Sequence, residues 1–239
     1  MTVFDLRHGP WQTALADVQQ VDAAIFDAPY SRKVHAGNED LGIRDDLGYA
    51  YMTPEQVHEH VAHWSPRVRG WFCSITCHIL APVWTEALEA QGRLAFAPLP
   101  IVARGMTVRL QGDGPSSWTC WLVVARPRTK AMAKWGTLPG AYIRGAGDIR
   151  SGRRGGKYEG TMRAIVRDYS RPGDLVLDTH AGEGTTGIAA ILEGRRFVGA
   201  DLEREVWLAA QDRARPHMAR AEAMVGVESG VTLGLPGMG

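Results

Sequence analysis

The segment Asp178–Thr186 constrains the fold of this chain most. It reads DTHAGEGTT and joins an apolar run typical of a strand, Asp174–Asp178, to a run typical of a helix, Gly184–Glu193. Gly182 and Gly184 allow the backbone to approach a ligand closely, because glycine has no side chain to collide with it. The free N–H groups at the start of the helix attract an anionic group. The segment therefore predicts a ligand-binding turn between a strand and a helix.

An acid closes the next predicted strand. Asp201 follows the run Arg196–Ala200 and lies 19 residues after Gly182. Nucleotide-binding α/β units place an acid at about this spacing, where it accepts hydrogen bonds from ribose hydroxyls. A tight turn with a surface aspartate is the alternative interpretation. The combination favours a ligand that contains a nucleoside.

Strand and helix patterns alternate through most of the chain. Thr53, Pro54 and Gln56 form a clear helix start, with an N-cap threonine, a proline at the first helical position and a glutamine three residues after the cap. The alternation predicts an α/β fold, a doubly wound and mostly parallel sheet with helices on both faces. The predicted strands are 21–26, 71–76, 94–97, 118–125, 174–178 and 196–200, and the predicted helices are 53–64, 79–91, 157–169, 184–193 and 203–215.

A second motif follows the first of these strands. Asp27, Ala28, Pro29 and Tyr30 come directly after the apolar run 21–26. Open α/β sheets bind ligands at the carboxyl ends of their strands, which is where this acid and this aromatic ring would lie. A simple polar turn is the alternative for the motif taken alone. A ligand-binding interpretation requires this motif and the glycine loop to line one common cleft.

Together the motifs resemble the amino-group DNA methyltransferases that use S-adenosylmethionine, in their permuted (β) class. In that class the catalytic motif precedes the cofactor motif, and the target-recognition segment lies between them. Asp27–Tyr30 resembles the family's Asp-Pro-Pro-Tyr, Asp178–Thr186 resembles Asp-Pro-Phe-Ala-Gly-Ser-Gly-Thr-Thr, and Gly156–Glu159 resembles its Lys-Pro-Glu segment. The chain is similar to small members of the family found in phages. It departs from the pattern at Ala28, Thr179, His180 and Glu183.

The resemblance implies a Rossmann-like methyltransferase domain and a division of labour along the chain. It assigns residues 1–125 to a catalytic half, 126–156 to a small basic target-recognition insertion, 157–225 to the cofactor-binding half of the same domain and 226–239 to a flexible tail. S-adenosylmethionine is the implied cofactor. The residues implied to bind it are Lys157, Glu159, Asp178, His180, Ala181, Gly182, Gly184, Thr185, Thr186 and Asp201.

The implied reaction is methyl transfer to adenine N6 of a flipped-out DNA base. The Asp27 carboxylate and the Ala28 carbonyl would accept the hydrogens of the target amine, and Tyr30, held after Pro29, would stack on the flipped base. Aspartate at the first motif position favours adenine in this family. Cytosine-N4 transfer is the alternative enzyme, and a catalytically inactive nucleic-acid-binding homologue is the alternative of another class.

Charge is concentrated in the middle of the chain. The net charge is only +1, but residues 126–171 contain twelve Lys or Arg against three acids. Such clustering is typical of polyanion binding, and a solvated basic loop is the alternative. DNA is therefore the expected partner, with relaxed or short-sequence specificity and with homodimerisation as an open option. The candidate DNA-binding residues are Arg32, Lys33, His35, Arg126, Arg128, Lys130, Lys134, Trp135, Arg144, Arg150, Arg153 and Arg154.

The remaining composition argues against other classes. The three cysteines form no CxxC pair, which fits a reducing cytoplasm, or the host cytoplasm for a phage protein. We expect no membrane segment, because no apolar run approaches the length that spans a bilayer. We also expect no metal site, because His58, His60 and His63 cannot share one helical face.

Overall fold

The computed structural model describes residues 3–34, 51–104, 114–129, 132, 135–145, 148 and 157–230, with the backbone alone from residue 220 onward. His35, Lys130, Lys134, Arg150, Arg153 and Arg154, all predicted to contact DNA, lie outside the described residues. Within the described part of the chain, no helix combines the length and the apolar character that crossing a bilayer requires.

Within the described residues, nine strands form a single sheet in the order β1-β9-β8-β2-β3-β6-β5-β7, with β4 paired to β6. The strands are β1 (Phe4–His8), β2 (Ala23–Asp27), β3 (Phe72–Thr76), β4 (Leu94–Ala95), β5 (Leu99–Val102), β6 (Thr119–Arg126), β7 (Tyr142–Ile143), β8 (Leu175–Asp178) and β9 (Arg196–Asp201). The helices are α1 (Trp11–Ala14), α3 (Pro54–Trp64), the 3-10 turn η1 (Ser65–Arg67), α4 (Ala81–Ala90), α5 (Glu159–Tyr169), α6 (Thr185–Leu192) and α7 (Arg204–Gly230).

The sheet is mostly parallel, as the alternating pattern predicts. Strands β1, β9, β8, β2 and β3 run parallel to one another, and β6 is antiparallel to β3, β4 and β5. Ala24 pairs with Leu177 although the two residues are far apart along the chain. The parallel register brings the carboxyl ends of β2, β8 and β9 to the same edge of the sheet.

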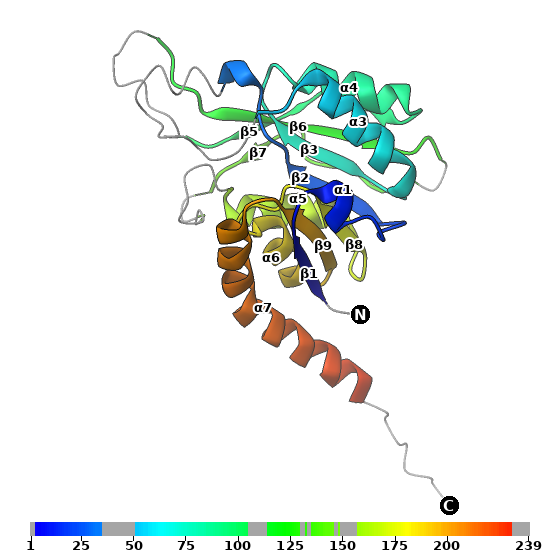
Figure 1. Cartoon of the computed structure of the whole chain (residues 1–239), viewed down its shortest axis with the longest axis vertical. Coiled ribbons are helices and arrows are strands. Elements are labelled where there is room, and N and C mark those ends of the chain that lie inside the picture. The colour runs from blue at the N-terminus through cyan, green and yellow to red at the C-terminus, as the bar shows by residue number, and fades with distance from the viewer. Residues whose placement is uncertain are drawn as a thin grey trace, which may run out of the picture.

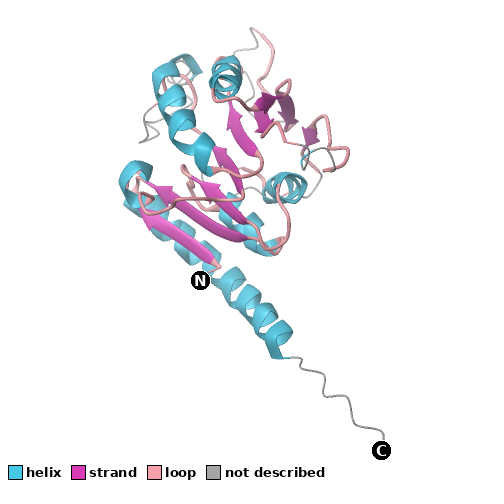
Figure 2. Cartoon of the chain, turned by 90° about the vertical axis from the view of Figure 1, so that its right-hand side faces the viewer, coloured by secondary structure: helices cyan, strands magenta, loops and turns pink. Residues whose placement is uncertain are grey.

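Helices cover both faces of the sheet (Figures 1 and 2). Alternate residues of a strand point to opposite faces, so in β2 the side chain of Ile25 packs into the core formed with α5, α6 and α7. Its neighbours Ala24 and Phe26 pack into the core formed with α1, α3 and α4. Strands buried on both sides read as continuous apolar runs, which is why β2 and β3 are visible in the sequence.

Helix α3 forms where its start signal predicts. Thr53 Oγ1 accepts a hydrogen bond from the Gln56 N–H at 3.3 Å, and Gln56 Oε1 accepts one from the Thr53 N–H at 2.9 Å. This reciprocal capping box satisfies backbone donors that the first turn would otherwise leave unpaired. The buried face of the helix consists of Val57, His60, Val61 and Trp64.

Several elements differ from the sequence-based expectation. Helix α7 continues past Arg215 to Gly230 and contains Pro216, so residues 226–230 are helical and only 231–239 of the expected tail lie outside the described residues. Pro216 lies on the exposed side, and the alanine-rich composition that follows favours helix. Strand β7 lies within the small insertion 126–156, for which no strand was predicted, and pairs with β5. Strand β1 was not predicted, and it extends the parallel sheet beside β9.

Candidate active site

Three carboxylates stand at the carboxyl ends of three neighbouring parallel strands. Asp27 ends β2, Asp178 ends β8 and Asp201 ends β9. The ring of Phe26, which directly precedes the Asp27–Tyr30 motif, and the ring of His180 in the glycine loop have centroids 6.2 Å apart. The structure thus brings the Asp27–Tyr30 motif and the glycine loop to the same edge of the sheet, as a common site requires.

Asp201 holds the glycine loop and the start of α7. Its Oδ2 accepts the Gly182 N–H at 2.7 Å, and its Oδ1 accepts the Glu203 N–H at 3.0 Å. Gly182 has φ +50°, a left-handed conformation that glycine adopts at little cost. The Asp201 carboxylate therefore holds the backbone of the glycine loop in this conformation.

The start of α6 is built on a second left-handed glycine. Gly184 is the N-cap residue with φ +72°, and no side chain caps the first turn. Thr185 and Thr186, which follow, are buried. The Ala181 N–H is already bonded to the Ala200 carbonyl at 3.0 Å. Such an N-terminus offers its backbone donors to an acceptor group of a ligand.

Asp178 is almost fully buried beneath the loop. Its carboxylate accepts the His180 N–H at 2.9 Å and a hydrogen bond from the Thr186 side chain. Burial outweighs these bonds, because desolvation penalises the charged form, and it raises the pKa of Asp178 to about 7. Asp178 therefore acts as a structural clamp between the two ends of the loop.

Asp27 is paired with Lys157. The Lys157 Nζ lies 2.6 Å from Asp27 Oδ2 and donates to the Tyr30 hydroxyl at 3.2 Å. Asp27 Oδ1 is buried and accepts no hydrogen bond from the described residues. Burial raises the pKa of Asp27 above its ordinary value, and the Lys157 charge opposes that rise. An acceptor oxygen without a partner is thus held at the end of β2.

Contacts with neighbouring residues hold the rest of the Asp27–Tyr30 motif in place. Ala28 is buried, and the Tyr30 carbonyl accepts the Met52 N–H at 3.0 Å. The Lys157 ammonium lies 5.3 Å from the centroid of the half-buried Tyr30 ring. Pro29 restricts the backbone between Ala28 and Tyr30.

Arg213 of α7 ties Glu159 to the glycine loop. Its guanidinium lies 3.8 Å from the Glu159 carboxylate, and it donates to the Glu183 carbonyl at 2.9 Å and to Thr185 Oγ1 at 3.0 Å. Glu159 is the first residue of α5. The sequence analysis missed Arg213, because nothing in the pattern of α7 separates it from a surface arginine.

A buried polar chain links α3 to the glycine loop. His60 Nε2 lies 2.8 Å from Thr179 Oγ1, which lies 2.9 Å from His180 Nδ1. His60 is 0% exposed. Burial lowers the pKa of His60 well below its ordinary value and lowers that of His180 to about 4. In the sequence, this series of polar contacts is indicated by one feature alone: a histidine, His60, falls on the buried face of α3 between Val57 and Trp64.

The described candidate DNA-binding residues are spread over several elements. Arg32, Lys33 and Arg128 are exposed, and the Arg126 guanidinium lies 5.8 Å from the centroid of the Phe96 ring. The Arg144 guanidinium lies 4.4 Å from the centroid of the Tyr158 ring.

Trp135 packs against the protein. The Trp135 Nε1–H donates to the Asp168 carbonyl at 2.7 Å, and the Arg171 guanidinium lies 3.9 Å from the centroid of its ring. Its ring also contacts Trp71 at a centroid distance of 5.9 Å. Trp135 thus anchors its segment to the end of α5.

Asp148 caps α5 from within the basic segment. Its Oδ1 accepts the Gly160 N–H at 2.7 Å, and its Oδ2 accepts the N–H and the hydroxyl of Thr161 at 3.0 and 2.8 Å. Because α5 begins just after Lys157, this cap joins the basic segment to the residue that pairs with Asp27. The sequence analysis did not identify Asp148.

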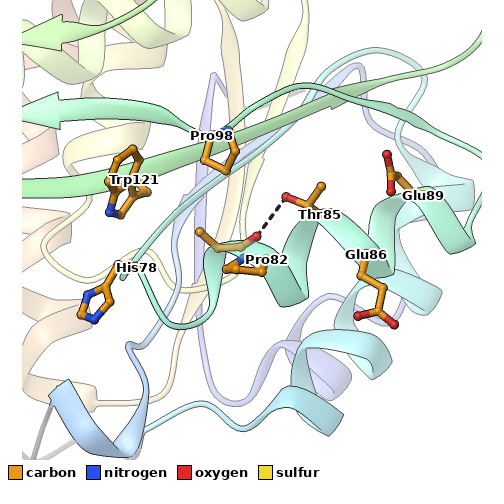
Figure 3. A pocket seen from close by; sticks show the side chains of 8 residues that line it. His78, Pro82, Thr85, Glu86, Glu89, Pro98 and Trp121 are labelled. Atoms are coloured by element: carbon orange, nitrogen blue, oxygen red, sulfur yellow. Dashed lines mark hydrogen bonds between the residues drawn. The ribbon is translucent and has the colours of Figure 1, made fainter.

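The described residues contain no group of three His, Cys, Asp or Glu side chains that could hold a metal ion. A separate pocket of about 470 Å³ opens beside the first turns of α4 (Figure 3). His78, Pro82, Trp121 and Pro98 line its inner part, and Glu86 and Glu89 lie along α4. Two carboxylates make this pocket unsuited to phosphate groups.

The comparisons agree with this geometry. Residues 156–212 match the family model of the N6/N4 DNA methylases, and this range contains every residue that the sequence analysis assigned to the cofactor. Over 49 residues the chain is 45% identical to the DNA adenine methyltransferase YhdJ of Escherichia coli (strain K12), a match that covers 20% of this chain and 17% of that protein. The match thus spans about a sixth of the length of this curated relative.

Solved structures match over most of the chain. The M1.HpyAVI–SAM complex superposes with a TM-score of 0.65 at 19% identity, covering 88% of this chain and 98% of that one. The cytosine-N4-specific PvuII DNA methyltransferase superposes with a TM-score of 0.62 at 10% identity, covering 92% of this chain and 94% of that one. The fold is therefore the mixed, mostly parallel α/β fold of DNA methyltransferases.

Proposed function

We propose that this protein is an S-adenosylmethionine-dependent DNA methyltransferase of the permuted class that modifies adenine N6. Residues 1–125 supply the catalytic motif, 157–225 supply the cofactor loop, and the basic segment 126–156 contacts DNA. The observation that carries the proposal is the position of Asp27. Its unpartnered Oδ1 stands at the same sheet edge as the glycine loop, whose sequence matches the N6/N4 DNA methylases.

The residues around the glycine loop fit the proposed cofactor. Its ribose hydroxyls would donate hydrogen bonds to Asp201, the acid that ends β9 and accepts the Gly182 N–H of the loop. The backbone N–H groups of the first turn of α6, which follows Gly184, suit its carboxylate. When bound, S-adenosylmethionine supplies a methyl group made electrophilic by the sulfonium. His180 of this loop lies against Phe26, and Lys157 contacts Asp27 of the catalytic motif.

The work of the catalytic motif is to make an aromatic amine nucleophilic. The lone pair of such an amine is delocalised into the base. Asp27 Oδ1 and the Ala28 carbonyl would accept its two hydrogens, which localises the lone pair on nitrogen. Asp27 must be ionised to do so, and Lys157 at 2.6 Å favours that form. Tyr30 offers its ring to a base that has left the helix stack.

Nucleoside analysis tests the proposal. Purified protein is incubated with isotopically labelled S-adenosylmethionine and unmethylated DNA, and the digested DNA is analysed by mass spectrometry. We expect labelled N6-methyladenine from wild type, none from Asp27→Ala, and wild-type levels from Asp212→Asn, which changes an exposed acid of α7. Labelled N4-methylcytosine would overturn the assignment of the base. Salt-sensitive DNA binding without any methyl transfer would overturn the assignment as an enzyme.

Cytosine-N4 transfer is the second candidate. The similar fold of the cytosine-N4-specific PvuII enzyme supports this second candidate, because the superposition covers 92% of this chain. Adenine N6 is preferred over cytosine N4 as the target because the first motif position is aspartate and not serine.

A further inference from the structure

The polar chain from His60 to His180 has no role in the function proposed so far. It is buried among aromatic rings, with the rings of Phe26 and Trp84 at centroid distances of 4.9 and 5.4 Å from His60. A buried polar chain in such surroundings is costly unless its hydrogen bonds are satisfied. Thr179 supplies these bonds to both imidazoles.

The charge state of the chain follows from its burial. Both imidazoles have lowered pKa values and are neutral at pH 7. A neutral imidazole has one nitrogen that donates and one that accepts. The Thr179 hydroxyl has a single proton, and among the described residues its hydrogen-bond partners are these two rings, so it donates to one ring and accepts from the other. Consequently the tautomer of His60 determines the tautomer of His180.

Only two arrangements satisfy this rule. Either both rings carry the proton on Nε2, or both carry it on Nδ1, because Thr179 contacts Nε2 of His60 and Nδ1 of His180. The Nδ1 atom of His60 is buried and has no partner among the described residues. An orphaned buried N–H is rarer in proteins than an orphaned acceptor. This favours the arrangement with both protons on Nε2.

We propose that His60 and Thr179 are positioning residues that hold His180 as a neutral ring with its proton on Nε2. This inference rests on the proposed function, because it makes His180 a hydrogen-bond donor for the carboxylate of S-adenosylmethionine. Within the described part of the chain, Nε2 of the half-buried His180 has no protein partner. A protonated Nε2 is also not a nucleophile, so it does not compete with the target amine for the methyl group.

Nuclear magnetic resonance of ¹⁵N-histidine-labelled protein at pH 7, without cofactor, tests the tautomers directly. We expect both His60 and His180 to carry the proton on Nε2. Thr179→Ser keeps the hydroxyl and should preserve this state, whereas Thr179→Val should give His180 a mixture of tautomers. His60→Phe is a second variant with the same expectation for His180. Melting temperatures verify that each variant is folded. The proposal would be overturned if one ring carried its proton on Nε2 and the other on Nδ1, or if either ring were charged. It would also be overturned if the tautomer of His180 were unchanged in both Thr179→Val and His60→Phe.

A double-mutant cycle on binding of S-adenosylmethionine separates positioning from a general structural effect. We expect Thr179→Val and His180→Phe each to raise Kd about tenfold, which is the loss of about one hydrogen bond. The double variant should be no weaker than His180→Phe alone, because Thr179 acts through the His180 ring. Additive losses would refute this coupling. If wild-type protein shows the predicted tautomers but binds no S-adenosylmethionine, the proposed function and the ligand assigned to His180 are refuted. The positioning of the His180 ring by His60 and Thr179 would still be established.

Discussion

Replacement of Lys157 by methionine would raise the pH at which the proposed methyl transfer takes place. Lys157 lies 2.6 Å from Asp27 Oδ2 and stabilises the ionised carboxylate. Burial already raises the pKa of Asp27, and removing the opposing charge raises it further. The acceptor form of Asp27 would then exist only at higher pH. The acidic limb of the pH–activity profile should therefore move upward.

The magnitude follows from the exposure of the pair. Removing one partner of a buried ion pair costs about 3–5 kcal/mol, and about 1.4 kcal/mol corresponds to one pKa unit. The Lys157 and Asp27 side chains are 17% and 27% exposed, so solvent screens part of this energy. We therefore take the lower end and expect an upward displacement of about 2 pH units.

The assay is methyl transfer to DNA at saturating S-adenosylmethionine between pH 5.5 and pH 9.5. Lys157→Met should lose about a hundredfold in rate on the acidic limb and recover at the alkaline end, because a displacement of about 2 units is a factor of about 100. Lys157→Arg keeps the charge and is the matched control. A limb that stays in place or moves to lower pH in folded Lys157→Met protein would contradict the reasoning. Uniform loss at every pH would indicate a role in binding instead.

Three further predictions concern the glycine loop and its support. Asp201→Ala removes two charge-assisted hydrogen bonds and should lower the free energy of unfolding, measured by urea titration, by roughly 2–4 kcal/mol. An unchanged urea midpoint would contradict the role of Asp201 in holding the glycine loop. Gly187→Ala would place a Cβ 2.6 Å from Phe4 and 2.7 Å from Phe197, so it should cost about 1–3 kcal/mol by thermal unfolding, whereas Gly145→Ala, with nothing within 4 Å, should be neutral. Asp178 has a pKa of about 7 against an ordinary value of 3.8, so the folded state binds the extra proton and its stability falls as pH rises between these values. Asp178→Asn should therefore gain stability relative to wild type from pH 5 to pH 8, and a relative loss would show that the sign is wrong.

Local patterns were sufficient to predict β2, β3, β8 and β9 of the parallel part of the sheet. The apolar runs of β2, β3, β8 and β9 are continuous because both faces of these strands are buried, and Thr53 and Gln56 mark the start of α3 without tertiary help. The glycine loop could likewise be placed from its residues, because strand, glycines and helix are contiguous.

Long-range pairing explains what the sequence did not predict. Strand β1 contains the charged residues Asp5 and Arg7 rather than a continuous apolar run, and its place in the sheet depends on β9, near the other end of the chain. The contacts of Lys157 with Asp27 and of His60 with Thr179 join residues more than a hundred positions apart. No periodicity encodes such contacts. The helical extension after Pro216 was missed because proline normally ends a helix.

The place of β2 between β3 and β8 has a consequence for protein synthesis. While the ribosome is still translating the middle of the chain, β2 and β3 can pair, but the other edge of β2 has no neighbour until Leu177 has emerged. An unpaired hydrophobic edge is where nascent chains associate wrongly. This edge of β2 therefore stays open until β8 has been made, and Asp27, which can pair with Ile75 early, meets Lys157 only after the middle of the chain has been translated.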